Sequence, residues 1–156
     1  MNRTTTATLA AFVLASASVA RAEFGIGINL GEPTGLNLRA GRDRTLEATA
    51  GWSLRDGGTN IVLVGNVLYH GHSVFSNSPL TGIVPYAGAG LGFWMWDDKH
   101  NDDGDKAGAW VQVPLGIDLR FTIPLEVTLH IDPGIDVVPN TNATIHWGLG
   151  IRYWLK

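Results

Sequence analysis

Charged side chains alternate with apolar ones in several segments of the chain, so the charges fall on one face of extended strands. Asp118 and Arg120 are two residues apart, as are His130 and Asp132, and side chains at this spacing point to the same side of a strand. The full set of candidates is Arg39, Glu47, Asp118, Arg120, Glu126, His130, Asp132, His146 and Arg152. We expect a structural network of ion pairs and hydrogen bonds, because unpaired charges in a confined interior are unfavourable. A path for protons or ions, or a catalytic cluster, is the alternative interpretation.

A second group of candidates is the acidic segment near residue 100, with aspartates at Asp97, Asp98, Asp102, Asp103 and Asp105. Carboxylates are ligands that Ca²⁺ prefers, so weak binding of a divalent cation is one interpretation of this segment. The spacing does not match an EF-hand loop, and a solvated loop explains the same residues.

Little in the sequence points to covalent catalysis or to a cofactor. His72 and Ser73 could pair a hydroxyl with a base, but they are adjacent in a loop and lack the third group of a triad. The chain has no cysteine, which excludes disulfides and thiolate chemistry. Gly88, Gly90 and Gly92 alternate within a strand and do not open a helix, so we predict no phosphate-binding loop and no cofactor.

The elements that must position these residues are strands. From residue 24 onward, runs with a two-residue period are separated by turn residues such as Glu32-Pro33 and Asp56-Gly57-Gly58, a pattern typical of β-structure. We expect eight strands, at 24–31, 34–41, 44–54, 60–70, 82–96, 108–121, 123–132 and 144–155. The predicted fold class is all-β, an eight-stranded antiparallel up-and-down barrel.

The two faces of these strands differ in kind. One face is almost purely apolar, whereas the other carries glycines, arginines and short acids but no lysine. A water-facing surface is expected to be rich in Lys and Glu. We therefore expect the apolar face to point outward to lipid and the polar side chains to fill the lumen of a narrow transmembrane barrel. Outward aromatic residues fall near both strand ends, as interfacial girdles do: Phe24, Tyr69, Phe121 and Tyr153 at one end, and Trp52, Phe93 and Trp147 at the other.

The first 22 residues have the pattern of a secretory signal peptide. Arg3 gives a positive start, an apolar run follows from Ala7 to Ala20, and Ala20-Arg21-Ala22 places small residues at a cleavage site. We expect residues 1–22 to be the signal peptide, cleaved near Ala22, and residues 23–156 to be the barrel domain. A net charge of −3 without a basic block argues against nucleic acid as a partner.

Four segments carry a resemblance to a known family: PYAGAGLG (85–92), VPLG (113–116), LHIDPG (129–134) and GLGIRYW (148–154). With them, the chain resembles the small eight-stranded outer-membrane barrel proteins of Gram-negative bacteria, in the style of OmpX and the OmpA barrel. The resemblance implies a monomer in the bacterial outer membrane, part of the cell envelope, with its termini in the periplasm. It also implies contact with outer-membrane lipid and lipopolysaccharide, and with periplasmic chaperones and the barrel-assembly machinery during biogenesis.

Two features depart from that family. Its members usually end in an aromatic residue, whereas this chain ends in Leu155-Lys156, and the long loop at 71–81 falls on the side of the termini. We expect a structural role, or an interaction through the loops at 55–60, 97–107 and 136–143, and no open pore. The alternatives are a lipid A-modifying barrel enzyme, an acyl ester hydrolase or acyltransferase, and a soluble periplasmic carrier of an apolar ligand that resembles lipocalins. The residues favour a role other than catalysis.

Overall fold

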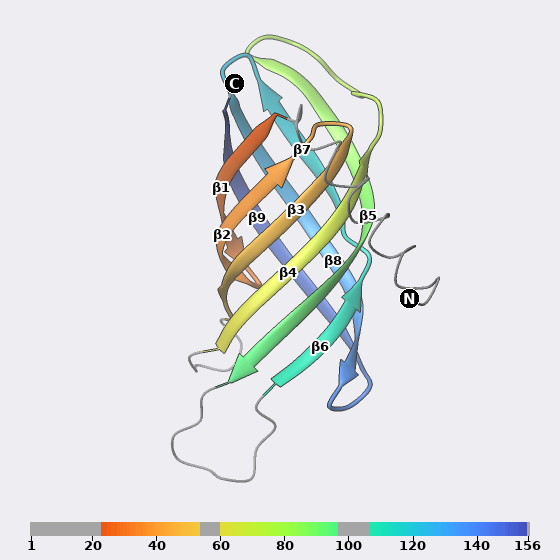
Figure 1. Cartoon of the computed structure of the whole chain (residues 1–156). Helices are drawn as coiled ribbons and strands as arrows, with labels where there is room; N and C mark the ends of the chain where they lie inside the picture. The colour runs from red at the N-terminus through yellow and green to blue at the C-terminus, as the bar shows by residue number, and fades with distance from the viewer. Residues whose placement is uncertain (1–22, 54–59, 97–106, 156) are drawn as a thin grey trace, which may run out of the picture.

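The chain folds into one antiparallel β-barrel (Figure 1). A computed structural model describes residues 23–53, 60–96 and 107–155. The strands are β1 Phe24–Gly31, β2 Thr34–Ala40, β3 Arg44–Trp52, β4 Asn60–His70, β5 Leu80–Trp96, β6 Ala107–Gln112, β7 Leu115–Phe121, β8 Leu125–Val138 and β9 Asn142–Leu155. No helix among the described residues is long and apolar enough to cross a membrane.

The first and last strands close the barrel. β1 pairs with β2 on one side and with β9 on the other, and the β1–β9 register runs from Phe24 opposite Leu155 to Gly31 opposite Gly148. The remaining neighbours are consecutive in the sequence, except that β6 and β7 each pair with both β5 and β8. Every strand therefore has a hydrogen-bonded neighbour on both sides, and the predicted up-and-down barrel is confirmed.

Pro114 divides the predicted strand 108–121 into β6 and β7. Both pieces pair with β5 on one side and with β8 on the other, so they are one wall strand and the barrel has eight. A proline has no N–H to donate to the ladder, which explains the interruption. The wall stays closed there, because the Val113 N–H donates to the Pro133 carbonyl and the Gly88 N–H donates to the Pro114 carbonyl, both at 2.9 Å.

The last hairpin is longer than the sequence predicts. The predicted strand 123–132 runs on to Val138, so the predicted loop 136–143 shrinks to residues 139–141. Proline is rare within sheets. Pro133 nevertheless stands opposite Ile145 in β9, and its carbonyl accepts the hydrogen bond from Val113. The β8–β9 hairpin extends past the neighbouring strands at the end opposite the C-terminus (Figure 1).

The two faces of the wall have the polarity that the sequence predicts. Leu115 and Leu129 on the outside are 41% and 46% exposed, whereas Arg39 and Arg152 inside are 1% and 3% exposed. The large exposed side chains are mainly aliphatic and aromatic. Most of the lumen is polar, with Leu68, Trp110 and a few other apolar side chains among the charges.

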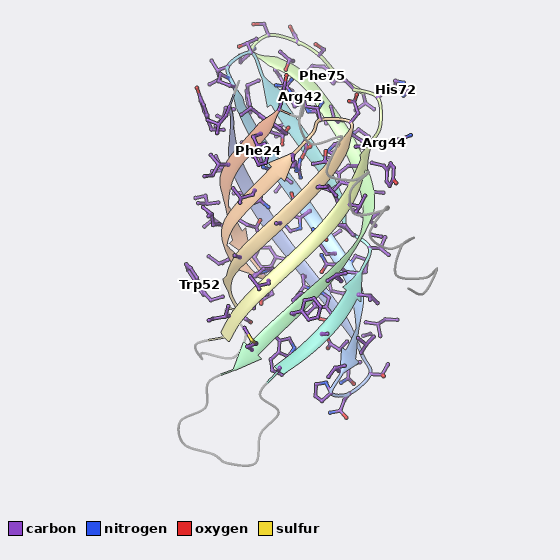
Figure 2. All side chains as sticks on the ribbon, in the orientation of Figure 1. Phe24, Arg42, Arg44, Trp52, His72 and Phe75 are labelled. Carbon is purple, nitrogen blue, oxygen red and sulfur yellow. The ribbon has the colours of Figure 1, made fainter. Side chains whose placement is uncertain are left out.

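Exposed aromatic side chains lie near both ends of the barrel. Phe24, Tyr69 and Tyr153 are exposed at the end where β9 finishes, and Trp52, Phe93 and Trp147 are exposed at the other end. Phe121 is half-buried. Figure 2 shows Phe24 and Trp52 on the outer surface at different heights of the wall.

The long loop at 71–79 lies at the end where β9 finishes, as strand counting predicts, and it is ordered as a small hairpin. The Val74 N–H donates to the Ile83 carbonyl and the Ile83 N–H donates to the Phe75 carbonyl, both at 3.0 Å. Asn77 and Leu80 form a bridge that turns the chain. The loop therefore folds back against the start of β5, with Val74 and Phe75 exposed.

Candidate functional site

The candidate site is the polar interior of the barrel. All nine residues that the sequence singles out as the lumen charge network have side chains on the inner face, and most are buried. Arg120 and His130 are the more accessible ones, with side chains 19% and 14% exposed. The structure arranges the nine as a central cluster and a second group, in which His130 pairs with Asp132 and His146 stands opposite Asp132 on the next strand.

Arg39 stands at the centre of the first cluster. Its Nε and Nη2 donate to Glu47 Oε2 at 3.0 and 2.7 Å. Its Nη1 donates to Asp118 Oδ2 at 2.7 Å and to Glu126 Oε1 at 3.0 Å. One guanidinium from β2 thus joins carboxylates from β3, β7 and β8 across the lumen. Charge-assisted hydrogen bonds of this kind are the strongest that side chains form.

Arg152 from β9 supports the same carboxylates from another side. Its Nη1 donates to Glu126 Oε1 at 2.6 Å and its Nη2 to Glu47 Oε2 at 3.0 Å. Its Nε also donates to Asn37 Oδ1 at 3.0 Å. Glu47 and Glu126 are therefore each bonded to two buried arginines, which compensates for the loss of their hydration.

Arg120 links this cluster to the barrel end where β9 finishes. Its Nε donates to Glu126 Oε2 at 3.3 Å, and its Nη2 donates to the Arg42 carbonyl in the β2–β3 turn at 3.1 Å. Arg42 itself lies over the Trp154 ring and forms an ion pair with Glu23. Arg120 and Arg42 therefore lie across the opening of the barrel at the end where β9 finishes.

His70 belongs to the cluster although the sequence analysis did not select it. Its Nε2 lies 2.9 Å from Asp118 Oδ2, and the Thr128 hydroxyl donates to Asp118 Oδ1 at 2.6 Å. The signal was available, because His70 continues the inward alternation of Asn66 and Leu68. Its inward orientation was difficult to predict because His70 is the last residue of β4 and lies next to a loop.

Amide side chains extend the network toward the other end of the barrel. Asn66 Nδ2 donates to Glu47 Oε1 at 3.1 Å, and Gln112 Nε2 donates to Asn66 Oδ1 at 3.0 Å. The Trp110 indole N–H then donates to Gln112 Oε1 at 2.5 Å. The alternation predicts a polar inner face, but it does not predict this chain of hydrogen bonds, because alternation identifies the face on which a side chain lies and not its partner.

His130 and Asp132 form a second pair, outside the central cluster. His130 Nδ1 lies 2.8 Å from Asp132 Oδ2, and His130 Nε2 lies 3.0 Å from Asn29 Oδ1. His146 stands opposite Asp132 in the β8–β9 ladder, with its ring 4.9 Å from the Trp110 ring and its Nε2 3.4 Å from the Thr144 hydroxyl.

Inward glycines make room for the large side chains of the lumen. A Cβ at Gly92 would lie 2.1 Å from the Trp110 ring, and one at Gly25 would lie 2.4 Å from Arg152 Cδ. Between the two polar groups remains a cavity with about 20 Å³ of space for the centre of a water-sized sphere, lined among others by Glu47, Arg152 and Asp132. This is room for about one water molecule, so side chains fill the barrel.

The other candidates have separate outcomes. Asp97, Asp98, Asp102, Asp103 and Asp105 lie outside the described residues. His72 and Ser73 are exposed in the 71–79 loop, and the Ser73 hydroxyl donates to the Phe75 carbonyl at 2.8 Å. Within the described ranges, no group of three or more His, Asp or Glu side chains is arranged to hold a metal ion.

Comparison with known proteins supports the architecture. No family model matches the sequence, and no curated protein matches it. Among solved structures, the chain is similar to the N-terminal β-barrel domain of Pseudomonas aeruginosa OprF, with 17% sequence identity and a TM-score of 0.64. The match covers 86% of this chain and 96% of that one.

The class that the closed wall and the polar interior define is the eight-stranded antiparallel barrel with inverted polarity. Within that class, the chain shares the fold of the N-terminal OprF barrel. At 17% identity the likeness concerns the fold alone, so the role of the network has to be argued from this chain's own residues.

Proposed function

We propose that the protein is an outer-membrane barrel of a Gram-negative cell, with a plugged lumen and a structural or loop-mediated interaction role. The observation that carries the proposal is the inverted polarity of the wall. Leucine, isoleucine, valine and aromatic side chains cover its outside, while Arg39, Asp118 and Glu126 are buried inside. A soluble monomer rarely exposes a large contiguous apolar surface. A bilayer requires such a surface, together with a closed hydrogen-bonded wall.

The same observation argues against the soluble-carrier alternative. A barrel that carries an apolar ligand needs an apolar cavity of several hundred cubic ångströms. Here the interior is occupied by ion pairs around Arg39 and Arg152, and the cavity beside them has room for about one water molecule. The filled lumen also supports a barrel without an open pore.

The proposal includes the route to the membrane. Residues 1–22 serve as a signal peptide cleaved near Ala22, and residues 23–156 form the monomeric barrel. This barrel contacts outer-membrane lipid and lipopolysaccharide after delivery by periplasmic chaperones and the barrel-assembly machinery. The mass of the protein recovered from cells tests the cleavage, which predicts an N-terminus at Glu23.

Fractionation of expressing cells tests the membrane location. We expect the chain in the outer-membrane fraction, released by detergent and not by high salt, and with faster gel migration before heating than after. Recovery from the periplasmic extract without detergent would favour the soluble carrier. Mass spectrometry of lipid A, with and without the protein, tests the enzyme alternative, and we expect an unchanged acyl pattern.

A further inference from the structure

His130 has an acceptor on each side of its ring. The Nδ1 atom lies 2.8 Å from Asp132 Oδ2 and the Nε2 atom lies 3.0 Å from Asn29 Oδ1. A carboxylate accepts hydrogen bonds and has no proton to give, so Nδ1 must be the donor toward Asp132. The proton belongs on the imidazole because histidine is the stronger base of the two.

The orientation of Asn29 fixes the donor on the other side. Asn29 Nδ2 donates to the Pro33 carbonyl at 2.6 Å, and a carbonyl can only accept. The amide oxygen of Asn29 is therefore the atom that faces His130, and Nε2 must donate to it. Both ring nitrogens need a hydrogen, which only the positively charged imidazolium has.

The charges of the lumen ion pairs agree with this assignment. In those pairs, the three arginines Arg39, Arg120 and Arg152 contact three carboxylates, Glu47, Asp118 and Glu126, and the fourth carboxylate, Asp132, pairs with His130. A protonated His130 supplies the fourth positive charge, beside the one carboxylate of the four that no arginine contacts in these pairs. The second oxygen of Asp132 is buried without a hydrogen-bond partner, so a neutral neighbour would leave this charge poorly compensated.

His70 provides the contrast. Its Nε2 lies 2.9 Å from Asp118 Oδ2, but its Nδ1 lies 3.4 Å from both the Thr45 hydroxyl and the Asp43 carbonyl. Contacts of 3.4 Å are longer than ordinary hydrogen bonds and do not require a second ring proton. Asp118 is also bonded to Arg39, so it has a cation without His70.

We propose that His130 is a proton-binding site of the lumen and that its second proton fastens β8 to the β1–β2 turn across β9. Asp132 lies on its own strand, and His146 of β9 stands opposite Asp132 in the ladder and is the other titratable side chain beside the pair. Glu47 of β3 and Arg152 of β9 line the neighbouring cavity and are bonded to each other at 3.0 Å. Glu32 is buried in the β1–β2 turn. The cross-strand neighbours on β7 and β9, Gly116 and Gly148, do not titrate.

Loss of the proton has a defined structural consequence. Asp132 retains the hydrogen on Nδ1, so the proton leaves from Nε2, and the ring then turns a lone pair toward Asn29 Oδ1. Two acceptors repel at that distance, so the link to Asn29 and the Pro33 carbonyl opens. The cavity that His130, Asn29 and Asp132 line gives the ring room to move.

Nitrogen-15 NMR of the imidazole rings tests the protonation state directly. The full mature chain is folded in detergent micelles, and the His130 signal is assigned by its loss in His130→Gln. At pH 7 we expect both His130 nitrogens to carry hydrogen. One bare and one protonated nitrogen would overturn the proposal. Should His130→Gln not fold, a chain with the other four histidines replaced leaves His130 as the single signal.

Thermal unfolding between pH 6 and pH 9 tests the consequence, with His70→Gln as the matched control. A folded state that holds a histidine proton more tightly than the unfolded chain loses stability as the pH rises. We expect the melting temperature of wild type and of His70→Gln to fall over this range, and that of His130→Gln to lose this dependence. An equal fall in all three proteins would overturn the proposal.

Discussion

Arg39 shows how a single residue organises the interior. Its guanidinium contacts Glu47, Asp118 and Glu126, which come from three strands. The sequence predicts that these charges share the lumen, because they follow one alternation. It does not predict which arginine reaches which acid, because that depends on the stagger of strands that are distant in sequence.

Asn29 and His70 were not among the predicted site residues, and the same reason applies to both. Asn29 and His70 both lie on the predicted inward face, yet neither stands in a charged pattern. Their importance comes from partners on other strands, Asn29 with His130 and His70 with Asp118. Such pairings require the closed ring and are invisible in a single strand.

The central position of Arg39 leads to the first prediction. Arg39→Met should lower the free energy of unfolding by about 3–5 kcal/mol, because removing one partner leaves buried carboxylates uncompensated. The control is Arg42→Met, whose ion pair with Glu23 is about half exposed and should contribute no more than about 1 kcal/mol. Urea titration of the protein folded in lipid vesicles measures both, and equal stability of the two variants would contradict the central role.

Two glycines of β9 give a second prediction. A Cβ at Gly148 would lie 2.5 Å from His130 Nε2 and 2.7 Å from Asn29 Oδ1, whereas at Gly150 its nearest neighbour is Thr128 Cβ at 3.4 Å. Gly148→Ala should therefore cost about 1–3 kcal/mol of overpacking, and Gly150→Ala should be much milder. The same urea titration compares them, and a more stable Gly148→Ala protein would show that the contact has room to spare.

At the scale of elements, the period of the sequence predicts most strands because each has one apolar and one polar face. The structure differs from the predicted strands in detail at two prolines. Pro114 interrupts the ladder between β6 and β7, although the alternation continues through it and the two pieces form one wall strand. Pro133 lies within β8, where its carbonyl accepts a hydrogen bond from Val113. The sequence alone does not show which prolines the ladder can accommodate.

The outer face of the wall gives a third prediction. Leu115 pairs with Ala87 and Ile131 well inside the wall, so Leu115→Arg should destabilise the barrel by about 2–4 kcal/mol if the face meets the centre of a bilayer. Leu155→Arg, at the end of β9, should cost only about 0–1 kcal/mol, as expected near an interface. Unfolding in vesicles measures the difference. Two equally tolerated arginines would mean that lipid does not cover this face.

At the scale of the whole molecule, the side chains in the lumen determine whether ions can pass through the barrel. The guanidinium of Arg39 and that of Arg152 bridge carboxylates on different strands, and the cavity beside them has room for about one water molecule. The composition predicts a filled narrow barrel, but the register that brings both arginines to Glu47 and Glu126 follows only from the strand pairing.

A fourth prediction concerns conductance. The purified barrel in a planar bilayer should show no steady ion current, because ions would have to displace buried pairs. Heat-denatured protein serves as the control for leakage from the detergent. A reproducible conductance step in the native sample, absent from that control, would contradict a plugged lumen.

The pairing of Phe24 with Leu155 also sets an order of events. The edge of β1 has no second neighbour until β9 has been synthesised, since all the strands between them are made first. Up to that moment an unfinished sheet presents open backbone groups, which can pair with other chains. A chain truncated before β9 would therefore form a sheet that cannot close into a barrel. Its unpaired strand edges are a feature that cellular proteases can recognise.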